Sequence, residues 1–395
     1  MRPQSILFVL ALGAAAGCSQ QTVSPPVSNT ALAIPHMRTA VTITTLYNFK
    51  GSPDGLDPEA GLTPIAGRFY GATRLGGTGQ RSDGTIFDVR EDGTEHVLHS
   101  FTGSPDGASP RAGLANLNNV LYGTTSQGGK NGNFGTVYEL KTDGSAAYRV
   151  VYNFKNAPDG NSPIGDLVAI NDKLFGTTLS GGENLKGTVF EVHPDGSERV
   201  VYSFSGTPDG EGPHGGLVQL NGSMYGTTEF GGANNLGCVF EVQQNGTERV
   251  LYSFKGADSG DGAAPYAGLT VLNGLLYGVT HEGGADDYGT VFEIHEDGTE
   301  RVIYSFKGSD GKFPFASLTV LKGLLYGTTI RGGSRDVGTI FEVHPDGAFR
   351  VLHSFSGTDG RWPAGTLAIS GGDALVGTTR SGGTTSNGTV FRVQL

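Results

Sequence analysis

A pair of adjacent glycines recurs seven times along this chain at intervals of about 50 residues, and no other feature constrains the fold as strongly. The first glycines of the pairs are Gly76, Gly128, Gly181, Gly231, Gly283, Gly332 and Gly382. Repeats of roughly 20–50 residues are typical of solenoids and propellers, in which each repeat is one supersecondary unit. The 395 residues are therefore predicted to form an array of similar modules.

Each module contains four short apolar runs, which in the fifth module are residues 268–272, 276–280, 289–294 and 301–306. The first run is joined to the second by pairs such as Asn221-Gly222, and the third to the fourth by pairs such as Asp297-Gly298. Asn-Gly and Asp-Gly favour two-residue hairpins, because type I′ turns need positive φ at both central residues. With 66 glycines and only 16% charged residues, each module is predicted to be a four-stranded antiparallel meander.

The two ends of the array indicate how it is closed. The sequence stops at Leu395, just after a third run at 388–393, and the missing fourth run appears at 42–49. An N-terminal strand that completes the last module would bury the two edges that an open array exposes. We therefore predict an all-β, seven-bladed β-propeller of four-stranded antiparallel blades, with a linear β-solenoid as the alternative.

Side-chain size predicts which strand lies innermost. The first run of each module begins with small residues, such as Gly215-Gly216 and Ala267-Gly268, as a crowded centre requires. The fourth run carries Glu and Arg, which suit an outer edge that must not pair with other chains. Repeated aromatic residues such as Tyr225 and Phe240 are interpreted as packing between blades.

Residues 1–18 are predicted to be an export signal, because Arg2 precedes a short apolar run that ends at Ala-Ala-Gly-Cys. This ending is similar to a bacterial lipobox, in which Cys18 would be lipidated and become the mature N-terminus. We therefore expect a lipoprotein of the cell envelope, at the outer membrane or the cell surface. Cleavage near Ala16 would instead give a secreted or periplasmic protein. Residues 19–40 are predicted to be a flexible tether and residues 41–395 the propeller.

Net charge and cysteine content limit the binding partners and the disulfide bonds that can be expected. The net charge is −11 with no cluster of Lys or Arg, so nucleic acid is not an expected partner. The second cysteine, Cys238, replaces a repeat threonine, so a disulfide with Cys18 is not expected. We expect a monomer that contacts a membrane only through a lipid anchor at Cys18.

The repeated LYGTT, GG, GTVFEV, DG and YSF sequences resemble the GloVer tandem repeat, which occurs in bacterial exported proteins with alternative surface anchors. The resemblance extends over about residues 42–395. It implies an exported, anchored, propeller-like repeat protein, and it implies no known reaction or ligand.

Seven aspartates, each followed by glycine, form the first candidate site. They are Asp54, Asp106, Asp159, Asp209, Asp261, Asp310 and Asp359. Oxygen ligands of this kind suit calcium, and Asp258 and Asp261 are the metal-binding candidates. Because all seven modules share the residue, a turn in which Asp caps its own loop is the preferred interpretation. No cofactor other than this calcium is expected.

Positions that differ between modules form the second candidate site, because a ligand site on a pseudo-symmetric ring is usually asymmetric. The residue after a repeated proline is Glu59, Arg111, Ile164, His214, Tyr266, Phe315 and Ala364. With the variable ends of the second strands, the catalytic candidates are His214, Glu229, His281 and Glu282. The ligand-binding candidates are Tyr266, His281, Glu282 and Tyr288.

Three functions remain open at this stage. Standard catalytic motifs such as GxSxG and HExxH are missing from the sequence, which favours a non-catalytic propeller that binds a protein or glycan partner at the cell envelope. The alternative is an extracellular hydrolase or lyase, acting on a polysaccharide or peptide, with its site on the top face of blades 4 and 5. A third interpretation is a surface-layer or adhesion component.

Overall fold

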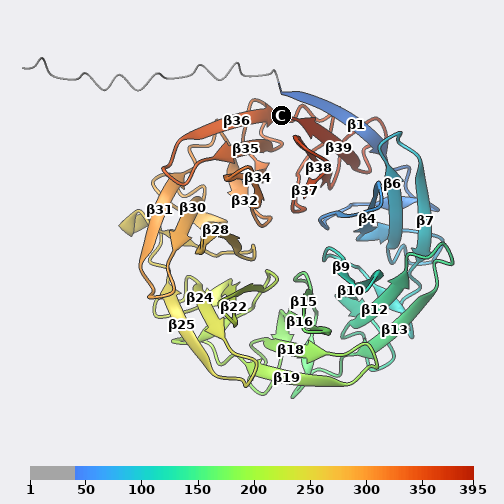
Figure 1. Cartoon of the computed structure of the whole chain (residues 1–395), viewed down its shortest axis with the longest axis horizontal. Helices are drawn as coiled ribbons and strands as arrows, with labels where there is room; N and C mark the ends of the chain where they lie inside the picture. The colour runs from blue at the N-terminus through green and yellow to red at the C-terminus, as the bar shows by residue number, and fades with distance from the viewer. Residues whose placement is uncertain (1–40) are drawn as a thin grey trace, which may run out of the picture. The chain divides into compact units, whose positions relative to one another are not determined.

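Four antiparallel strands, arranged from the central axis to the rim, form each repeating unit of this computed structural model, which describes residues 41–395 (Figure 1). Blade 1 contains β3 (Thr63–Ile65), β4 (Arg68–Thr73), β6 (Thr85–Arg90) and β7 (Glu95–Ser100). Seven such sheets surround the axis, so the predicted all-β, seven-bladed propeller is confirmed.

Blades 2 to 6 repeat the same order of strands. Blade 2 contains β9 (Ala115–Leu117), β10 (Val120–Thr125), β12 (Thr136–Lys141) and β13 (Tyr148–Asn153); blade 3 contains β15 (Val168–Ile170), β16 (Lys173–Thr178), β18 (Thr188–Val192) and β19 (Glu198–Ser203). Blade 4 contains β21 (Val218–Leu220), β22 (Ser223–Thr228), β24 (Cys238–Val242) and β25 (Glu248–Ser253); blade 5 contains β27 (Thr270–Leu272), β28 (Leu275–Thr280), β30 (Thr290–Ile294) and β31 (Glu300–Ser305). Blade 6 contains β33 (Thr319–Leu321), β34 (Leu324–Arg331), β35 (Thr339–Val343) and β36 (Phe349–Ser354), with β32 (Lys312–Pro314) added beside β34.

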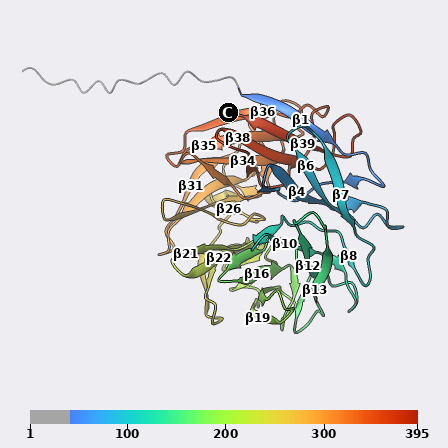
Figure 2. The same cartoon turned by 45° about the vertical axis from the view of Figure 1, so that its right-hand side comes forward.

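Blade 7 is assembled from both ends of the described chain. It contains β37 (Ala368–Ile369), β38 (Ala374–Thr379), β39 (Thr389–Gln394) and β1 (Thr42–Asn48) as its outermost strand. The antiparallel register of β1 on β39 runs from Thr42 opposite Gln394 to Asn48 opposite Thr389, and both views show the two strands side by side (Figures 1 and 2). The predicted closure by the N-terminal strand is confirmed.

The two kinds of hairpin turn differ, which corrects part of the prediction. Between the first and second strands, Asn221 has φ 49° and Gly222 has φ 91°, as a type I′ turn requires. In the Asp-Gly pairs between the third and fourth strands only the glycine has positive φ, for example Gly93 at 83°. The Asp92 carboxylate accepts a hydrogen bond from the Thr94 amide at 2.9 Å. Aspartate therefore caps this turn through its side chain, and the turn is not type I′.

The core lies between neighbouring blades, where the repeated aromatic side chains pack. Phe240, for example, contacts Phe204 edge to face at a centroid separation of 4.9 Å, and both are fully buried. At the axis the inner strands meet backbone to backbone. A Cβ added to Gly215 would lie 2.2 Å from the Gly268 amide nitrogen. This contact explains the small residues that begin the first strand of each blade.

Cys238 is a buried free thiol, and its sulfur lies 3.1 Å from the Thr228 hydroxyl. Its place in the fold is that of the threonines that pair with each other in the other blades, such as Thr280 and Thr290 at 2.8 Å. Cys18, the tether and the predicted export signal lie outside the described residues. Residues 41–395 include no helix that is long and apolar enough to cross a membrane.

Four glutamates on the outer strands lie in the grooves between blades, each beside the Tyr–Asp hydrogen bond of the preceding blade. Tyr47, for example, donates to Asp54 at 2.8 Å, and Glu95 of blade 1 lies beside this pair. In each glutamate Oε1 is buried and has no hydrogen-bond partner in the described part of the chain. Burial, followed by repulsion from the neighbouring aspartate, raises the pKa to about 7 for Glu95, Glu198, Glu248 and Glu300.

We predict that thermal stability falls as the pH rises from 6 to 8. A folded-state pKa of about 7 lies above the unfolded value, which is near 4.3, so these glutamates contribute stability below pH 4.3 that is lost as the pH passes through 7. Melting temperatures measured by calorimetry at pH 6, 7 and 8 test this. Replacing all four glutamates by glutamine should flatten the pH dependence, and an equally flat wild-type profile would contradict the prediction.

Candidate functional site

Loops of two kinds meet on one face of the propeller, which we call the top face. In blade 4, the loop that enters the blade forms β20 (Gly210–Glu211), which pairs with β23 (Phe230–Gly231) after the second strand. Equivalent two-stranded pairs are β2 (Gly55–Leu56) with β5 (Leu75–Gly76), β8 (Gly107–Ala108) with β11 (Gln127–Gly128), β14 (Gly160–Asn161) with β17 (Ser180–Gly181), and β26 (Gly262–Ala263) with β29 (Glu282–Gly283). The Gly-Gly loops and the Asp-Gly loops therefore share this face, as their sequence positions predict.

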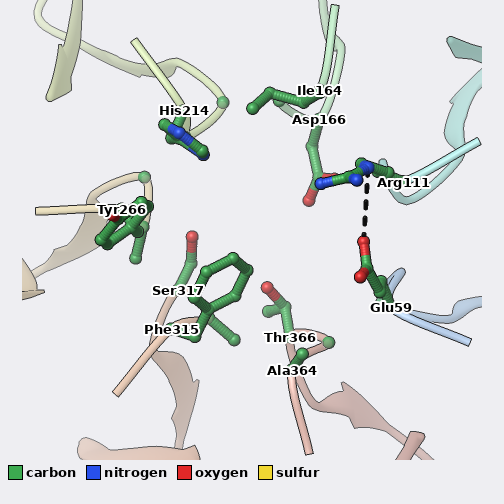
Figure 3. Close-up of a pocket in the computed structure, with 18 residues that line it drawn as sticks. Glu59, Arg111, Ile164, Asp166, His214, Tyr266, Phe315, Ser317, Ala364 and Thr366 are labelled. Atoms are coloured by element: carbon green, nitrogen blue, oxygen red, sulfur yellow. Dashed lines mark ion pairs between the residues drawn. The ribbon is translucent and has the colours of Figure 1, made fainter. Parts of the chain in front are cut away.

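An open cavity lies on the axis of the top face (Figure 3). It is lined by the variable residue of every blade, namely Glu59, Arg111, Ile164, His214, Tyr266, Phe315 and Ala364. Its volume is ≈ 70 Å³. The seven variable residues that follow the repeated proline thus converge on one small site.

The wall on the side of blades 4 to 6 is aromatic and hydrogen-bonded. The Tyr266 hydroxyl donates to Glu229 Oε1 at 2.8 Å, and His214 Nε2 lies 3.0 Å from Glu229 Oε2. Tyr266 also packs its ring against Phe315 at a centroid distance of 5.3 Å. Burial alone would raise the pKa of Glu229, but the hydrogen bonds from His214 and Tyr266 outweigh it and hold that pKa below its usual value. Glu229 is therefore a carboxylate that fixes two rings of the wall.

His281 lies behind this wall and does not line the cavity. Its ring contacts Tyr266 edge to face at 4.8 Å and stacks on Phe313 at 5.0 Å. Burial lowers the pKa of His281, an effect that the Pro314 backbone only partly opposes, so the imidazole is neutral at pH 7. Its Nδ1 is buried and has no partner of good hydrogen-bond geometry among residues 41–395.

Glu282 and Tyr288 lie farther from the axis. The Glu282 side chain is exposed, and its carboxylate makes no hydrogen bond or ion pair with the described residues. Partial burial, then the nearby carboxylates of Asp287 and Glu229, raise the pKa of Glu282. The Tyr288 ring lies edge to face with Phe313 at 6.0 Å and below the Lys312 ammonium at 5.1 Å. Of the residues chosen from the sequence, His214 and Tyr266 line the cavity, and Glu229 and His281 support its wall. Glu282 and Tyr288 lie outside the cavity.

The opposite wall, at blades 7, 1 and 2, is ionic. Glu59 lies 2.6 Å from Arg380, 3.4 Å from Arg74 and 3.6 Å from Arg111. Asp57 pairs with Arg74 at 2.6 Å and with Arg380 at 3.0 Å. Both carboxylates are buried. Because Arg380 follows β38 of blade 7 and the carboxylates belong to blade 1, this ion cluster spans the closure of the ring.

Asp166 lies on the floor of the cavity, next to Arg111 (Figure 3). Its Oδ1 accepts a hydrogen bond from the Gly113 amide of blade 2 at 2.6 Å. The Asp166 side chain is in contact with the water of the channel, but the surrounding blades reduce its hydration, and this burial raises the pKa of Asp166. Asp166 also lines a second cavity that lies below the first.

The seven repeated aspartates stabilise the turns in which they lie. Each carboxylate accepts hydrogen bonds from its own loop backbone and pairs with a Tyr or His at the end of an outer strand. Asp261 Oδ2 accepts from the Tyr252 hydroxyl and the Lys255 amide, and Oδ1 accepts from the Gly262 amide. Asp258 is exposed on a short 3₁₀ turn, η1 (Ala257–Ser259). Within residues 41–395 no three His, Cys, Asp or Glu residues are arranged to hold a metal ion.

Sequence reasoning did not select Asp166, Arg74 or Arg380. Arg74 and Arg380 could have been found from the sequence, because each follows the Gly-x-Thr that ends a second strand, and the other five modules have no Arg at this variable position. Asp166 could also have been found from the sequence, because the other six blades have Gly, Ser or Thr at its position. A comparison of the inner strands for charge as well as for size would have found it.

The fold and this cavity define a class, that of seven-bladed β-propellers with an axial site on one face. The Gloeobacter/Verrucomicrobia repeat matches the chain at residues 33–157, 78–271, 121–336 and 321–395. The chain therefore belongs to the Gloeobacter/Verrucomicrobia repeat family, which confirms the resemblance to the GloVer repeat. No curated protein matches the sequence.

Solved structures show the same fold at low sequence identity. A protein of unknown function from Bacteroides thetaiotaomicron VPI-5482 superposes with a TM-score of 0.51 and 11% identity, over 90% of this chain and 76% of that one. An ancestral GH74 enzyme superposes with a TM-score of 0.58 and 11% identity, over 86% of this chain and 48% of that one. At these identities the likeness shows the fold alone.

Proposed function

We propose that this propeller is a non-catalytic binding protein whose axial cavity holds part of a glycan. One observation carries the proposal: the residue after the repeated proline differs in every blade, and in all seven blades it lines this cavity, whereas the shared residues build the blades and their turns. A requirement of the fold would be met in the same way by every blade. A difference between blades that is concentrated at one cavity is expected when a ligand is asymmetric.

The chemistry of the two walls favours a sugar. Tyr266 and Phe315 offer partly exposed ring faces, against which the apolar C–H face of a sugar ring can pack. Across the cavity, the Arg111 guanidinium donates hydrogen bonds only, and the Asp166 carboxylate accepts them. Hydroxyl groups both donate and accept, so one sugar ring can satisfy both side chains. A peptide side chain of the same size offers fewer such groups.

A hydrolase is the second candidate, and the His214–Glu229 pair favours it. A carboxylate that orients an imidazole at a cavity wall is one part of an acid–base site. Both oxygens of Glu229, however, are already engaged by Tyr266 and His214, and its lowered pKa keeps it from donating a proton. The wall is therefore better suited to holding fixed rings than to transferring protons.

We also propose that the protein is exported and anchored to the cell envelope through a lipid on Cys18. The support is the sequence of residues 1–18, with its short apolar run and lipobox-like ending. Metabolic labelling with a clickable fatty acid, compared between wild type and Cys18→Ala, tests this. Equal labelling of the two would remove Cys18 as the anchor.

Glycan binding is tested with residues 41–395 on an array of bacterial and plant polysaccharides. We expect binding to at least one polysaccharide and a loss of at least tenfold in affinity for Tyr266→Ala, because this change removes a ring face and releases Glu229. Phe134→Ala is the matched control, since Phe134 is the blade 2 counterpart of Tyr288 and lies away from the cavity lining. Binding to no glycan, or equal binding by the Tyr266 variant, would contradict the proposal, and release of free sugars would favour the hydrolase.

A further inference from the structure

Asp166 is the one residue of the cavity floor that breaks the pattern of the repeats. The equivalent position in the other six blades is Gly61, Gly113, Gly216, Gly268, Ser317 and Thr366. These small residues suit the crowded axis, where neighbouring inner strands contact each other through the backbone. A carboxylate in this ring therefore needs an explanation other than packing.

The fold gains little from this carboxylate. Its Oδ1 accepts one hydrogen bond from Gly113, whereas Oδ2 has no partner within residues 41–395. No ion pair involves Asp166 in this part of the chain, and its enclosure raises its pKa, which means that the charged form is disfavoured there. Replacement by the glycine of its neighbours would relieve this cost. Retaining such a group is typical of binding sites, which are often built at the expense of stability.

The Asp166 side chain lines the cavity between the two walls. Figure 3 shows Asp166 beside Arg111, with Tyr266 and Phe315 across the cavity from them. A carboxylate accepts hydrogen bonds from two neighbouring hydroxyl groups, one on each oxygen or both on the free one. A ring that stacks on the aromatic wall would thus present its polar edge to Asp166.

We propose that the axial cavity recognises the terminal sugar of a glycan chain and that Asp166 is its anchor. This inference rests on the glycan-binding function proposed above and specifies which part of the chain is bound. The cavity is small, at ≈ 70 Å³, so it takes at most one sugar ring, and Asp166 lines the boundary between it and the second cavity below.

The following sugars of the chain leave the cavity along a row of rings. From Tyr266 the row continues to His281 at 4.8 Å, to Phe313 at 5.0 Å and to Tyr288 at 6.0 Å, each measured between neighbouring centroids. All four rings are partly exposed on the top face. Tyr288 and Phe313 thus have a place in the binding of a chain, although neither lines the cavity.

The first test asks whether binding follows chain ends or chain mass. The probe is a polysaccharide that binds on the array, used intact and after partial acid hydrolysis to shorter chains. At equal mass the hydrolysate carries more ends, so we expect it to inhibit binding more strongly, in proportion to the number of ends. Inhibition that follows mass alone would overturn terminal recognition while leaving glycan binding in place.

The second test replaces the anchor. Asp166→Gly should keep or raise the melting temperature, because it restores the residue of the neighbouring blades, and should lower affinity for the hydrolysate at least tenfold. Asp166→Asn, which keeps one acceptor oxygen, should lose less. Glu183→Gln removes one negative charge from an exposed loop of the same blade and should bind as wild type. Unchanged affinity of Asp166→Gly in a folded protein would overturn the anchor. Absence of binding by the wild type would instead reject the proposed function itself.

Discussion

Replacing Phe49 by aspartate should unfold the propeller or open its ring at room temperature. Phe49 follows β1 and is fully buried, in contact with Phe87 of blade 1 at a centroid distance of 5.0 Å. Loss of a buried Phe side chain alone costs about 3–5 kcal/mol, and burial of an unpaired carboxylate adds several more. Together these costs approach the whole stability of an ordinary domain, which is about 5–15 kcal/mol.

The matched control is Val97→Asp on β7, another outer strand. Val97 is 37% exposed, so its replacement should change stability by less than about 1 kcal/mol. Circular dichroism melts and size-exclusion chromatography measure the outcome for both variants. Because an opened ring exposes the edge of β39, we also expect Phe49→Asp to associate into larger species. A melting temperature equal to that of wild type would mean that β1 is not needed for closure.

Replacing Arg380 by methionine should give the second largest effect. Arg380 lies between Asp57 and Glu59 and joins blade 7 to blade 1, and the side chains of the two carboxylates are only 11% and 6% exposed. Removing one partner of a buried ion pair typically costs 3–5 kcal/mol, because it leaves an uncompensated charge. Since Arg74 remains to pair with both carboxylates, we expect about 3 kcal/mol, measured by urea unfolding at pH 7.

Lys322→Met provides the comparison, because Lys322 and Asp373 form an ion pair between blades 6 and 7 in which the side chains are 63% and 48% exposed. Exposed pairs contribute about 0–1 kcal/mol. Equal destabilisation by the two substitutions would show that burial of the Arg380 cluster is unimportant. The combined change of Arg380, Asp57 and Glu59 to apolar residues should recover part of the loss, because no charge is then left unpaired.

The architecture could be predicted because the same pattern of strands and turns recurs in seven modules. A single Asn-Gly or Gly-Gly pair is weak evidence for a hairpin, but recurrence at a fixed spacing removes most alternatives. The closure of the ring by the N-terminal strand could also be predicted, because it required only a count of the apolar runs at the two ends of the array. The turn at Asp92 was interpreted wrongly because its residue pair alone does not distinguish a type I′ turn from a turn that is capped by its own aspartate.

The site was predictable only in part. The variable positions identified His214 and Tyr266 correctly as neighbours on the top face, because strand order fixes the face on which a loop lies. Strand order does not, however, give the distance of a loop residue from the propeller axis. Glu282 and Tyr288 follow the same strand as His281, yet they lie farther out than the cavity, because the loop runs toward the rim. Asp166 was missed because its position had been considered only for size.

The separation of the variable residues from the scaffold has a consequence for evolution. Seven side chains, one from each blade, face a common cavity, and each follows a proline in a loop whose backbone the other blades reproduce. A change at one of these positions alters the contacts offered to a ligand and leaves the shared turns and strands in place, although Glu59 also belongs to the ion cluster that joins blades 7 and 1. If the proposed function holds, single substitutions at the other six positions can change ligand preference without altering the repeated scaffold. The same seven positions form a natural set for randomisation in a designed binding protein.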